Sequence, residues 1–298
     1  MKIKVITSYK PNSWNRYAKR SIDSVLANWP ADIDLRIYHE SQPQDIFKND
    51  RIEWIDLHEA QPELVAFKGR HKNDPVANGE LQEVPGGKKR PGSGPGAVGK
   101  GSFQWHAVRF ANKVYCITHA IKTIKDYDYI IWLDADTYTF RSIPKEFLES
   151  LCPTDTMLTY LGRENKDYKE ANKEPETGFV SYNLKHPEIQ NWANDYQTLY
   201  TSDNIFKVPG GWVDTHTFWY LVKIYQKEKN ITVNDIGHLK KVKGHHVFIN
   251  SELGLYIDHF KGKRKQVGTS NKNDLKPGPN GLPTDVWNVD YWKGRPVS

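Results

Sequence analysis

Cysteine and long apolar runs are both scarce in this sequence. Only two of its 298 residues, Cys116 and Cys152, are cysteines. Two cysteines are too few for a disulfide framework, so we expect a reducing compartment. No stretch approaches the roughly 20 apolar residues that cross a membrane, and the start MKIKVITSYK lacks the apolar core of a signal peptide. These absences predict a cytoplasmic protein without a membrane span.

Basic residues exceed acidic ones, and the formal net charge is +6. They form clusters at Lys88–Arg90, Lys240–Lys243 and Lys261–Lys265. A basic balance suits a nucleic acid, an anionic surface or a phosphorylated small molecule. Most Trp and Tyr residues lie in apolar runs, which favours a role in the core or against a sugar ring over stacking on nucleic-acid bases. We therefore predict no specific nucleic-acid partner.

The first 60 residues alternate between the patterns of strand and helix. Strands are expected at residues 2–7, 34–39 and 51–57, and a helix over residues 16–28. A strand–helix–strand opening is typical of an α/β domain with parallel strands.

Residues 60–101 break this pattern, because they are polar throughout. Their second half, residues 84–101, is dense in Gly and Pro and predicts a flexible loop of the kind that can cover an active site. The chain from about residue 268 is rich in Pro, Gly and Asn. No repeat or linker is evident, so we expect a single domain over residues 1–298.

The most informative stretch is YDYIIWLDADTYTFR, residues 127–141. Its apolar run, residues 129–133, predicts a strand buried on both faces. Asp134 and Asp136 follow that strand two residues apart, so their side chains point to the same side of an extended backbone. Two adjacent carboxylates repel each other unless a cation lies between them. Mg²⁺ and Mn²⁺ prefer oxygen ligands and complete their shell with substrate phosphates. The pair therefore predicts a metal–diphosphate site.

A second motif, His259-Phe260-Lys261-Gly262-Lys263-Arg264-Lys265, lies 125 residues farther along (259 minus 134). WLDADT resembles the DXD motif of nucleotide-sugar glycosyltransferases of the GT-A fold. The second motif is similar to the HFxGxxK motif of the glycogenin-like and lipopolysaccharide-galactosyltransferase family. The segment from Arg109 to Lys113 resembles a donor-side segment of related phage and bacterial glycosyltransferases. The resemblance implies an α/β fold, GT-A and Rossmann-like, with a mostly parallel sheet flanked by helices.

The same resemblance implies a metal-dependent hexosyltransferase that uses Mn²⁺ or Mg²⁺ and a nucleotide-sugar donor, UDP-sugar in that family. It implies His259 as a third metal ligand beside Asp134 and Asp136. It implies that Gly262 and Lys265 hold the donor diphosphate. Transfer in that family retains the anomeric configuration. This chain departs from it in having Glu176-Thr177-Gly178 in place of Asn-Ala-Gly, and Gln266-Val267 in place of Pro-Trp after the final Lys.

Sugar transfer also needs a carboxylate on the other side of the anomeric carbon, as a base or to stabilise positive charge. Glu176 and Asp214 are the candidates, and the aromatic surroundings of Asp214 in the sequence favour it. Lys113 lies in a segment that resembles the donor side of related enzymes. Thr7 and Tyr9, at the end of the first strand, are candidates for the base and ribose by the fold rule that ligands bind at strand ends.

Each of these residues also has a simpler structural interpretation. An Asp-X-Asp pair after a strand can serve a turn, and a lone His259 beside an apolar run is commonly structural. Glu176 can be a surface carboxylate. Asp214 can cap a helix, and Lys113 can border an apolar helix stripe with its charge in water.

Two other classes of protein stay open. A phosphatase of the haloacid dehalogenase type also places Asp-X-Asp after an apolar strand. It requires Thr or Val two residues beyond the second Asp, where this chain has Tyr138. The second class is a basic nucleic-acid-binding protein with stacking aromatic residues. For a glycosyltransferase the acceptor could be a glycan, a lipid, a protein or a modified base, and the sequence does not distinguish them.

Overall fold

The computed structural model describes residues 1–40, 48–79, 104–163, 174–237, 246–275 and 284–295. The chain divides into two compact units. The first consists of Met1–Ile55, Asp126–His186 and Thr232–Ser298, and the second of Asp56–Lys125 and Pro187–Ile231. The single domain over residues 1–298 stays a prediction.

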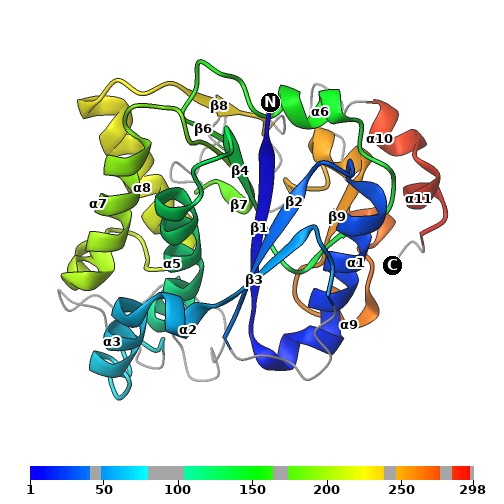
Figure 1. Cartoon of the computed structure of the whole chain (residues 1–298). Helices are drawn as coiled ribbons and strands as arrows, with labels where there is room; N and C mark the ends of the chain where they lie inside the picture. The colour runs from blue at the N-terminus through cyan, green and yellow to red at the C-terminus, as the bar shows by residue number, and fades with distance from the viewer. Residues whose placement is uncertain (41–47, 80–103, 164–173, 238–245, 276–283, 296–298) are drawn as a thin grey trace. The chain divides into compact units, whose positions relative to one another are not determined.

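Within the described residues, the first unit is built on a seven-stranded sheet in the order β3-β2-β1-β4-β7-β6-β8. Its strands are β1 Ile3–Tyr9, β2 Asp34–His39, β3 Ile52–Asp56, β4 Tyr129–Leu133, β6 Leu158–Leu161, β7 Glu176–Asn183 and β8 Val233–Asp235. Strand β1 pairs in parallel with β2 and β4, and β6 with β8. Strand β7 is antiparallel to β4 and β6. The α/β class and a mostly parallel sheet are thus confirmed (Figure 1).

One face of this sheet is covered by helices of the same unit. They are the π-helical turn η2 Trp14–Ala18 and helix α1 Lys19–Asn28. Helices α6 Lys145–Ser150, α10 Thr284–Asn288 and α11 Asp290–Lys293 belong to the same unit, and Leu148 of α6 and Trp292 of α11 join its apolar cluster. Helix α1 buries Ile22 and Val25 in one apolar cluster with Val5 of β1 and Ile131 of β4. Apolar residues on one stripe of a helix pack in this way against the alternating residues of a strand. The expected helix over residues 16–28 therefore begins as a π-turn and continues as α1.

A two-stranded ribbon lies beside α1 and positions the candidate site. It joins β5 Thr137–Thr139 to β9 Ile257–His259 in antiparallel register, with Thr137 opposite His259. Helix α1 holds the ribbon, because the amide of Thr139 donates to the Ser24 hydroxyl at 3.0 Å. Just before β9 the chain forms the 3-10 turn η4 Glu252–Leu255.

The second unit is helical. Its elements are α2 Leu57–Ala60, α3 Pro62–Arg70, α5 Ala107–Thr123, α7 Ile189–Thr201, the 3-10 turn η3 Asn204–Lys207 and α8 Asp214–Glu228. Helix α5 packs against α3, α7 and α8. The expectation that residues 60–101 lack regular structure was wrong at α3, which Pro62 opens and Leu64 and Phe67 anchor in the core. The Gly/Pro-rich loop expected at residues 84–101 lies outside the described residues.

The chain after β9 carries short helices in its described part, most of them in the Pro/Gly/Asn-rich end. They are α9 Arg264–Val267, the 3-10 turn η5 Lys272–Asp274, α10 and α11. Trp292 of α11 is fully buried, and its indole nitrogen donates to the Gly254 carbonyl at 2.8 Å. This contact ties the end of the chain to the core of the first unit. No helix in the described part of the chain combines the length and apolar character needed to cross a membrane.

Candidate active site

Asp134 and Asp136 lie in a tight turn that joins β4 to β5. The amide of Asp134 donates to the Gly178 carbonyl at 2.9 Å, and its own carbonyl accepts the amide and the hydroxyl of Thr137. The Asp136 carbonyl accepts the amide of Phe260 at 2.8 Å. Backbone hydrogen bonds to Gly178 of β7 and to Phe260 after β9 therefore hold the turn that carries both carboxylates. The indole of Trp132 adds a hydrogen bond to Asp134 Oδ1 at 2.7 Å.

His259 completes a three-residue cluster. Its Nε2 lies 3.3 Å from Asp136 Oδ1 and 3.7 Å from Asp134 Oδ2. One potential ligand atom from each residue lies within 4.8 Å of the other two. The ribbon register explains the arrangement, because β9 brings His259 opposite Thr137, the residue after Asp136. The structure thus brings together all three residues that the sequence predicted as metal ligands.

The donor set suits a divalent ion. Ligands at about 2.1 Å from one small divalent ion lie roughly 3–4 Å from one another, and Mn²⁺ accepts both carboxylate oxygen and imidazole nitrogen. His259 is 3% exposed and Asp136 is 7% exposed. Two carboxylates brought this close, one of them buried, require a cationic partner. These residues therefore fit a metal ion.

Lys265 supplies positive charge to the same carboxylates. Its ammonium pairs with Asp136 Oδ2. Burial alone would raise the pKa of Asp136, but His259 and Lys265 override it and hold the pKa below its ordinary value. Burial would likewise lower the pKa of His259, and Asp136 raises it instead. The charge states of Asp136, His259 and Lys265 therefore depend on one another. A divalent ion would supply part of the positive charge that His259 and Lys265 now provide to Asp136.

Gly262 lies in the segment between His259 and Lys265 and has a φ of +59°. A Cβ on Gly262 would meet nothing within 4 Å, so the left-handed backbone conformation, rather than crowding, favours glycine here. The amide of Lys265 donates to the Gly262 carbonyl at 3.3 Å. The turn leaves open space at Gly262, which suits close approach of a ligand to the backbone.

Glu176, the first residue of β7, is buried and doubly paired. Its Oε2 accepts from Arg163 Nη2 at 3.1 Å and also pairs with the ammonium of Lys261. Burial alone would raise its pKa, but Lys261, His259 and Arg163 hold the pKa of this carboxyl well below its ordinary value. The interpretation of Glu176 as a surface carboxylate was wrong. Neither of its partners was recognised from the sequence.

Thr7 and Tyr9 at the end of β1 are both buried. The Thr7 hydroxyl has no hydrogen-bond partner within the described part of the chain. Tyr9 is 4% exposed, and its ring lies 5.1 Å from that of Trp14 in the apolar core. Packing accounts for Tyr9, while Thr7 keeps a polar group near the strand end where ligands bind in open α/β sheets.

Lys113 and Asp214 form an ion pair inside the second unit. Lys113 of α5 and Asp214, the first residue of α8, are 2.8 Å apart, and both side chains are largely buried. Val213, not Asp214, is the N-cap of α8, so the simple capping interpretation of Asp214 was wrong. A carboxylate in the first turn is nevertheless stabilised by the helix dipole. The ion pair links α5 to the start of α8 within the second unit.

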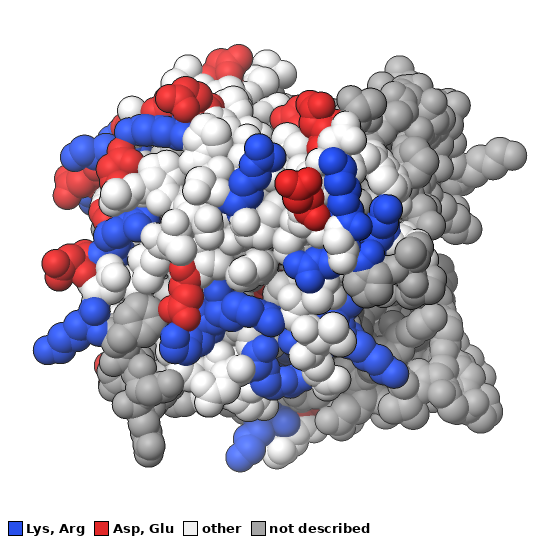
Figure 2. Space-filling view, turned by 90° about the vertical axis from the view of Figure 1, so that its right-hand side faces the viewer, with Lys and Arg blue, Asp and Glu red and all other residues white. Residues whose placement is uncertain are grey.

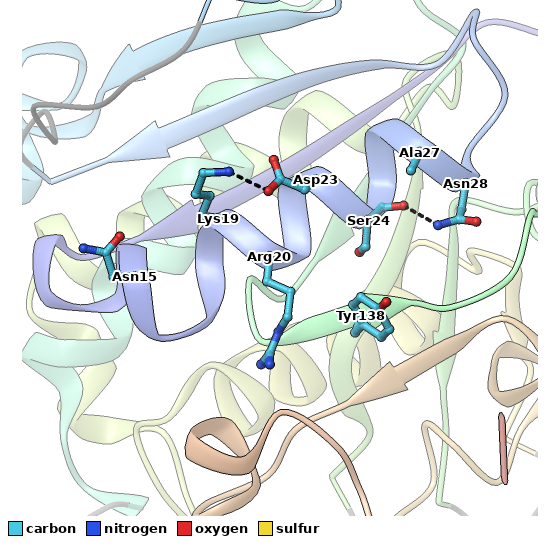
Figure 3. Close-up of a pocket in the computed structure, with 8 residues that line it drawn as sticks. All are labelled: Asn15, Lys19, Arg20, Asp23, Ser24, Ala27, Asn28 and Tyr138. Atoms are coloured by element: carbon cyan, nitrogen blue, oxygen red, sulfur yellow. Dashed lines mark hydrogen bonds and ion pairs between the residues drawn. The ribbon is translucent and has the colours of Figure 1, made fainter. Parts of the chain in front are cut away.

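A separate open pocket of about 390 Å³ lies along α1 (Figure 3). Its lining residues are Asn15, Lys19, Arg20, Asp23, Ser24, Ala27, Asn28 and Tyr138. Lys19 pairs with Asp23, and Asn28 donates to the Ser24 carbonyl. Its polar groups therefore serve largely to stabilise the helix, and none of the predicted site residues lines it.

Figure 2 shows the side of the molecule that lies at the right in Figure 1, where α1, α9 and α11 are drawn. Lys and Arg side chains are spread over this view, and few Asp and Glu accompany them in its lower half. A surface of this kind attracts anions. It agrees with the sequence-based expectation of a phosphorylated or otherwise anionic ligand.

No protein-family model matches the sequence, and no curated protein matches it significantly. Solved structures that resemble the chain include the galactosyltransferase LgtC in complex with donor and acceptor sugar analogs. It is 12% identical with a TM-score of 0.46, over 99% of this chain and 97% of that chain. Mouse xyloside xylosyltransferase 1 is 10% identical with a TM-score of 0.43, over 78% of this chain and 84% of that chain.

The glycosyltransferase GlyE of Streptococcus pneumoniae TIGR4 is 10% identical with a TM-score of 0.41 over 79% of this chain. This chain spans 45% of the length of GlyE. All three of these solved structures are glycosyltransferases. At these identities and TM-scores, an activity has to be argued from the residues of this chain.

Proposed function

We propose that this chain is a metal-dependent glycosyltransferase that moves a sugar from a nucleotide-sugar donor, a UDP-sugar, to an acceptor hydroxyl. The observation that carries the proposal is the joining of two distant motifs: Asp134 and Asp136 meet His259 within 4.8 Å. Lys265, from the second motif, pairs with Asp136 in the same place. A pair of carboxylates that served only a turn would need neither the histidine nor the lysine.

Asp134, Asp136 and His259 would hold Mn²⁺ or Mg²⁺. When bound, the ion supplies positive charge that stabilises the departing nucleoside diphosphate. Lys265 is the cation of this chain that would contact the diphosphate, and the open turn at Gly262 would allow its close approach. Both belong to one short segment after β9, so the phosphate contacts and His259 are positioned together.

The transfer breaks the bond between the anomeric carbon and the phosphate oxygen, and that oxygen keeps the electron pair. A new bond forms from the acceptor oxygen to the anomeric carbon, and the acceptor proton passes to a base. We assign a carboxylate role to Asp214, with Lys113 as its partner, and we propose a retaining outcome from the motif resemblance. Thr7 and Tyr9 remain the proposed contacts for base and ribose, with Thr7 the better placed for polar contact.

The experiment is to incubate the protein with UDP-, GDP- and CMP-sugars and to measure release of the free nucleotide with Mn²⁺, with Mg²⁺ and with EDTA. We expect the free nucleotide to be released from sugars of one nucleotide class only, and only with a metal ion present. Asp136→Ala should release none. The matched control is Asp155→Ala, since Asp155 is an exposed aspartate of the same unit. Equal release in EDTA would contradict the metal mechanism. Hydrolysis of simple phosphate monoesters, with no turnover of any nucleotide sugar, would favour the phosphatase alternative.

A further inference from the structure

Glu176 binds two cations with one oxygen. Lys261 and Arg163 both contact its Oε2. The Glu176 side chain is 9% exposed, whereas Lys261 is 36% exposed and Arg163 is 30% exposed. A buried carboxylate needs one counter-charge. Two cations therefore leave a surplus of one positive charge, and both Lys261 and Arg163 are partly exposed to solvent.

This arrangement lies next to the metal cluster. A Cβ on Gly178 would be 3.4 Å from Glu176 Oε1 and 2.8 Å from Cε1 of His259. Glu176 and His259 therefore flank the same small residue. Lys261 follows His259 by two residues, in the short segment after β9. Its ammonium, held by Glu176, stands beside the histidine that would bind the metal.

With His259 neutral, as a metal ligand would be, the formal charges of the described site residues balance. Three carboxylates, Asp134, Asp136 and Glu176, face three cations, Lys261, Lys265 and Arg163. A divalent ion would leave the site with two positive charges. The donor diphosphate carries two negative charges as a diester, and it gains a third as the sugar departs. The count suits an uncharged sugar on the donor, and a cation that can move toward the diphosphate would stabilise the third charge as it develops.

We propose that Lys261 contacts the donor diphosphate and that Glu176 is its positioning residue, an inference that rests on the proposed function. In the absence of donor, Glu176 keeps Lys261 beside His259. When the diphosphate binds, Lys261 donates to a phosphate oxygen, and Arg163 remains as the counter-charge of Glu176. The shared oxygen gives Arg163 this role, because it already contacts the atom that Lys261 leaves.

The test is calorimetric titration with UDP in the presence of Mn²⁺. Loss of one charge-assisted hydrogen bond corresponds to about 10–100-fold in affinity, so Lys261→Ala should weaken UDP binding by that factor. Lys261→Arg should recover most of the affinity. The matched control is Lys263→Ala, which removes an exposed lysine from the same segment and should stay within about twofold of wild type, as surface changes usually do.

Glu176→Gln separates positioning from general stability. It should weaken UDP binding as much as Lys261→Ala does and leave Mn²⁺ binding unchanged. The double variant Glu176→Gln/Lys261→Ala should bind UDP no more weakly than either single variant. If the wild type binds UDP and Lys261→Ala has the same affinity as Lys263→Ala, this inference is overturned and the proposed function stands. Failure of the wild type to bind any nucleoside diphosphate with Mn²⁺ would overturn the proposed function itself. Lys261→Ala tests the contact between Lys261 and the diphosphate even if Glu176→Gln does not fold.

Discussion

Gly178 leaves the space that His259 occupies: a Cβ on Gly178 would lie 2.8 Å from Cε1 and 3.2 Å from Nδ1 of the imidazole. Contacts this short force something to shift. Both neighbours are constrained, since Gly178 lies within β7 and His259 is the last residue of β9. The glycine is therefore a condition for the position of His259.

We predict that Gly178→Ala displaces the imidazole and weakens Mn²⁺ binding by about 10–100-fold, the range seen when the support of a metal ligand is lost. Manganese titration monitored by calorimetry or electron paramagnetic resonance measures it. The control is Gly69→Ala, because a Cβ on Gly69 meets nothing within 4 Å. Unchanged manganese affinity in Gly178→Ala would show that His259 is not a ligand.

Asp214→Asn tests the proposed catalytic carboxylate. We expect turnover to fall by about 10²–10⁴-fold, the usual contribution of a general base or acid. Affinity for UDP with Mn²⁺ should not change, because the donor diphosphate contacts are assigned to other residues. Steady-state kinetics with a UDP titration measures both quantities. Full turnover in this variant would remove Asp214 from the reaction.

The Lys113–Asp214 pair makes a prediction about stability. Both side chains are largely buried, with 12% and 9% exposure, and removing one partner leaves the other charge buried, at a cost of about 3–5 kcal/mol. Lys113→Met should therefore destabilise the protein strongly. The double variant Lys113→Met/Asp214→Asn should recover about 1–3 kcal/mol of the summed losses. Urea unfolding of the four proteins measures the coupling, and simple additivity would contradict a direct pair.

Glu176 makes stability depend on pH. Its pKa in the folded protein lies well below the ordinary value of 4.5, so it binds fewer protons folded than unfolded in the range between the two pKa values. Its contribution is therefore fully present above pH 4.5 and is lost as the pH falls toward the folded pKa. Glu176→Gln should be less stable than wild type at pH 7, and the gap should narrow at pH 3.5. Urea unfolding at both pH values measures it, and a constant or wider gap would contradict the pairing.

Local pattern predicted the strand that precedes the two carboxylates. The apolar run before Asp134 is β4, and both carboxylates follow its end. His259 is 125 residues away from Asp134, and composition offers no route to it; only the resemblance of residues 259–265 to the HFxGxxK motif singled it out.

The partners of Glu176 could not be found in this way. Lys261 is 85 residues from Glu176 along the chain, and an ion pair across that distance is decided by which strands become neighbours. The run Lys261–Lys265 looked uniform in the sequence. The structure divides it, since Lys261 pairs with Glu176, Lys265 with Asp136 and Arg264 with Asp274.

Helix α3 and the helices near the end of the chain were missed for a different reason. Polar composition concealed α3, although Pro62 and Glu63 in its first turn are start signals. The density of Pro, Gly and Asn after residue 268 hid Trp292, which is buried against Gly254. In both places tertiary packing stabilises segments whose own helix propensity is weak.

The most direct test of this account is a calorimetric titration of UDP into wild type and into Asp136→Ala, each with Mn²⁺ and with EDTA. We predict binding only for wild type with Mn²⁺, because Asp136 joins the proposed metal ligands to Lys265. UDP binding of equal strength in EDTA, or in Asp136→Ala, would contradict a metal–diphosphate site at the end of β4.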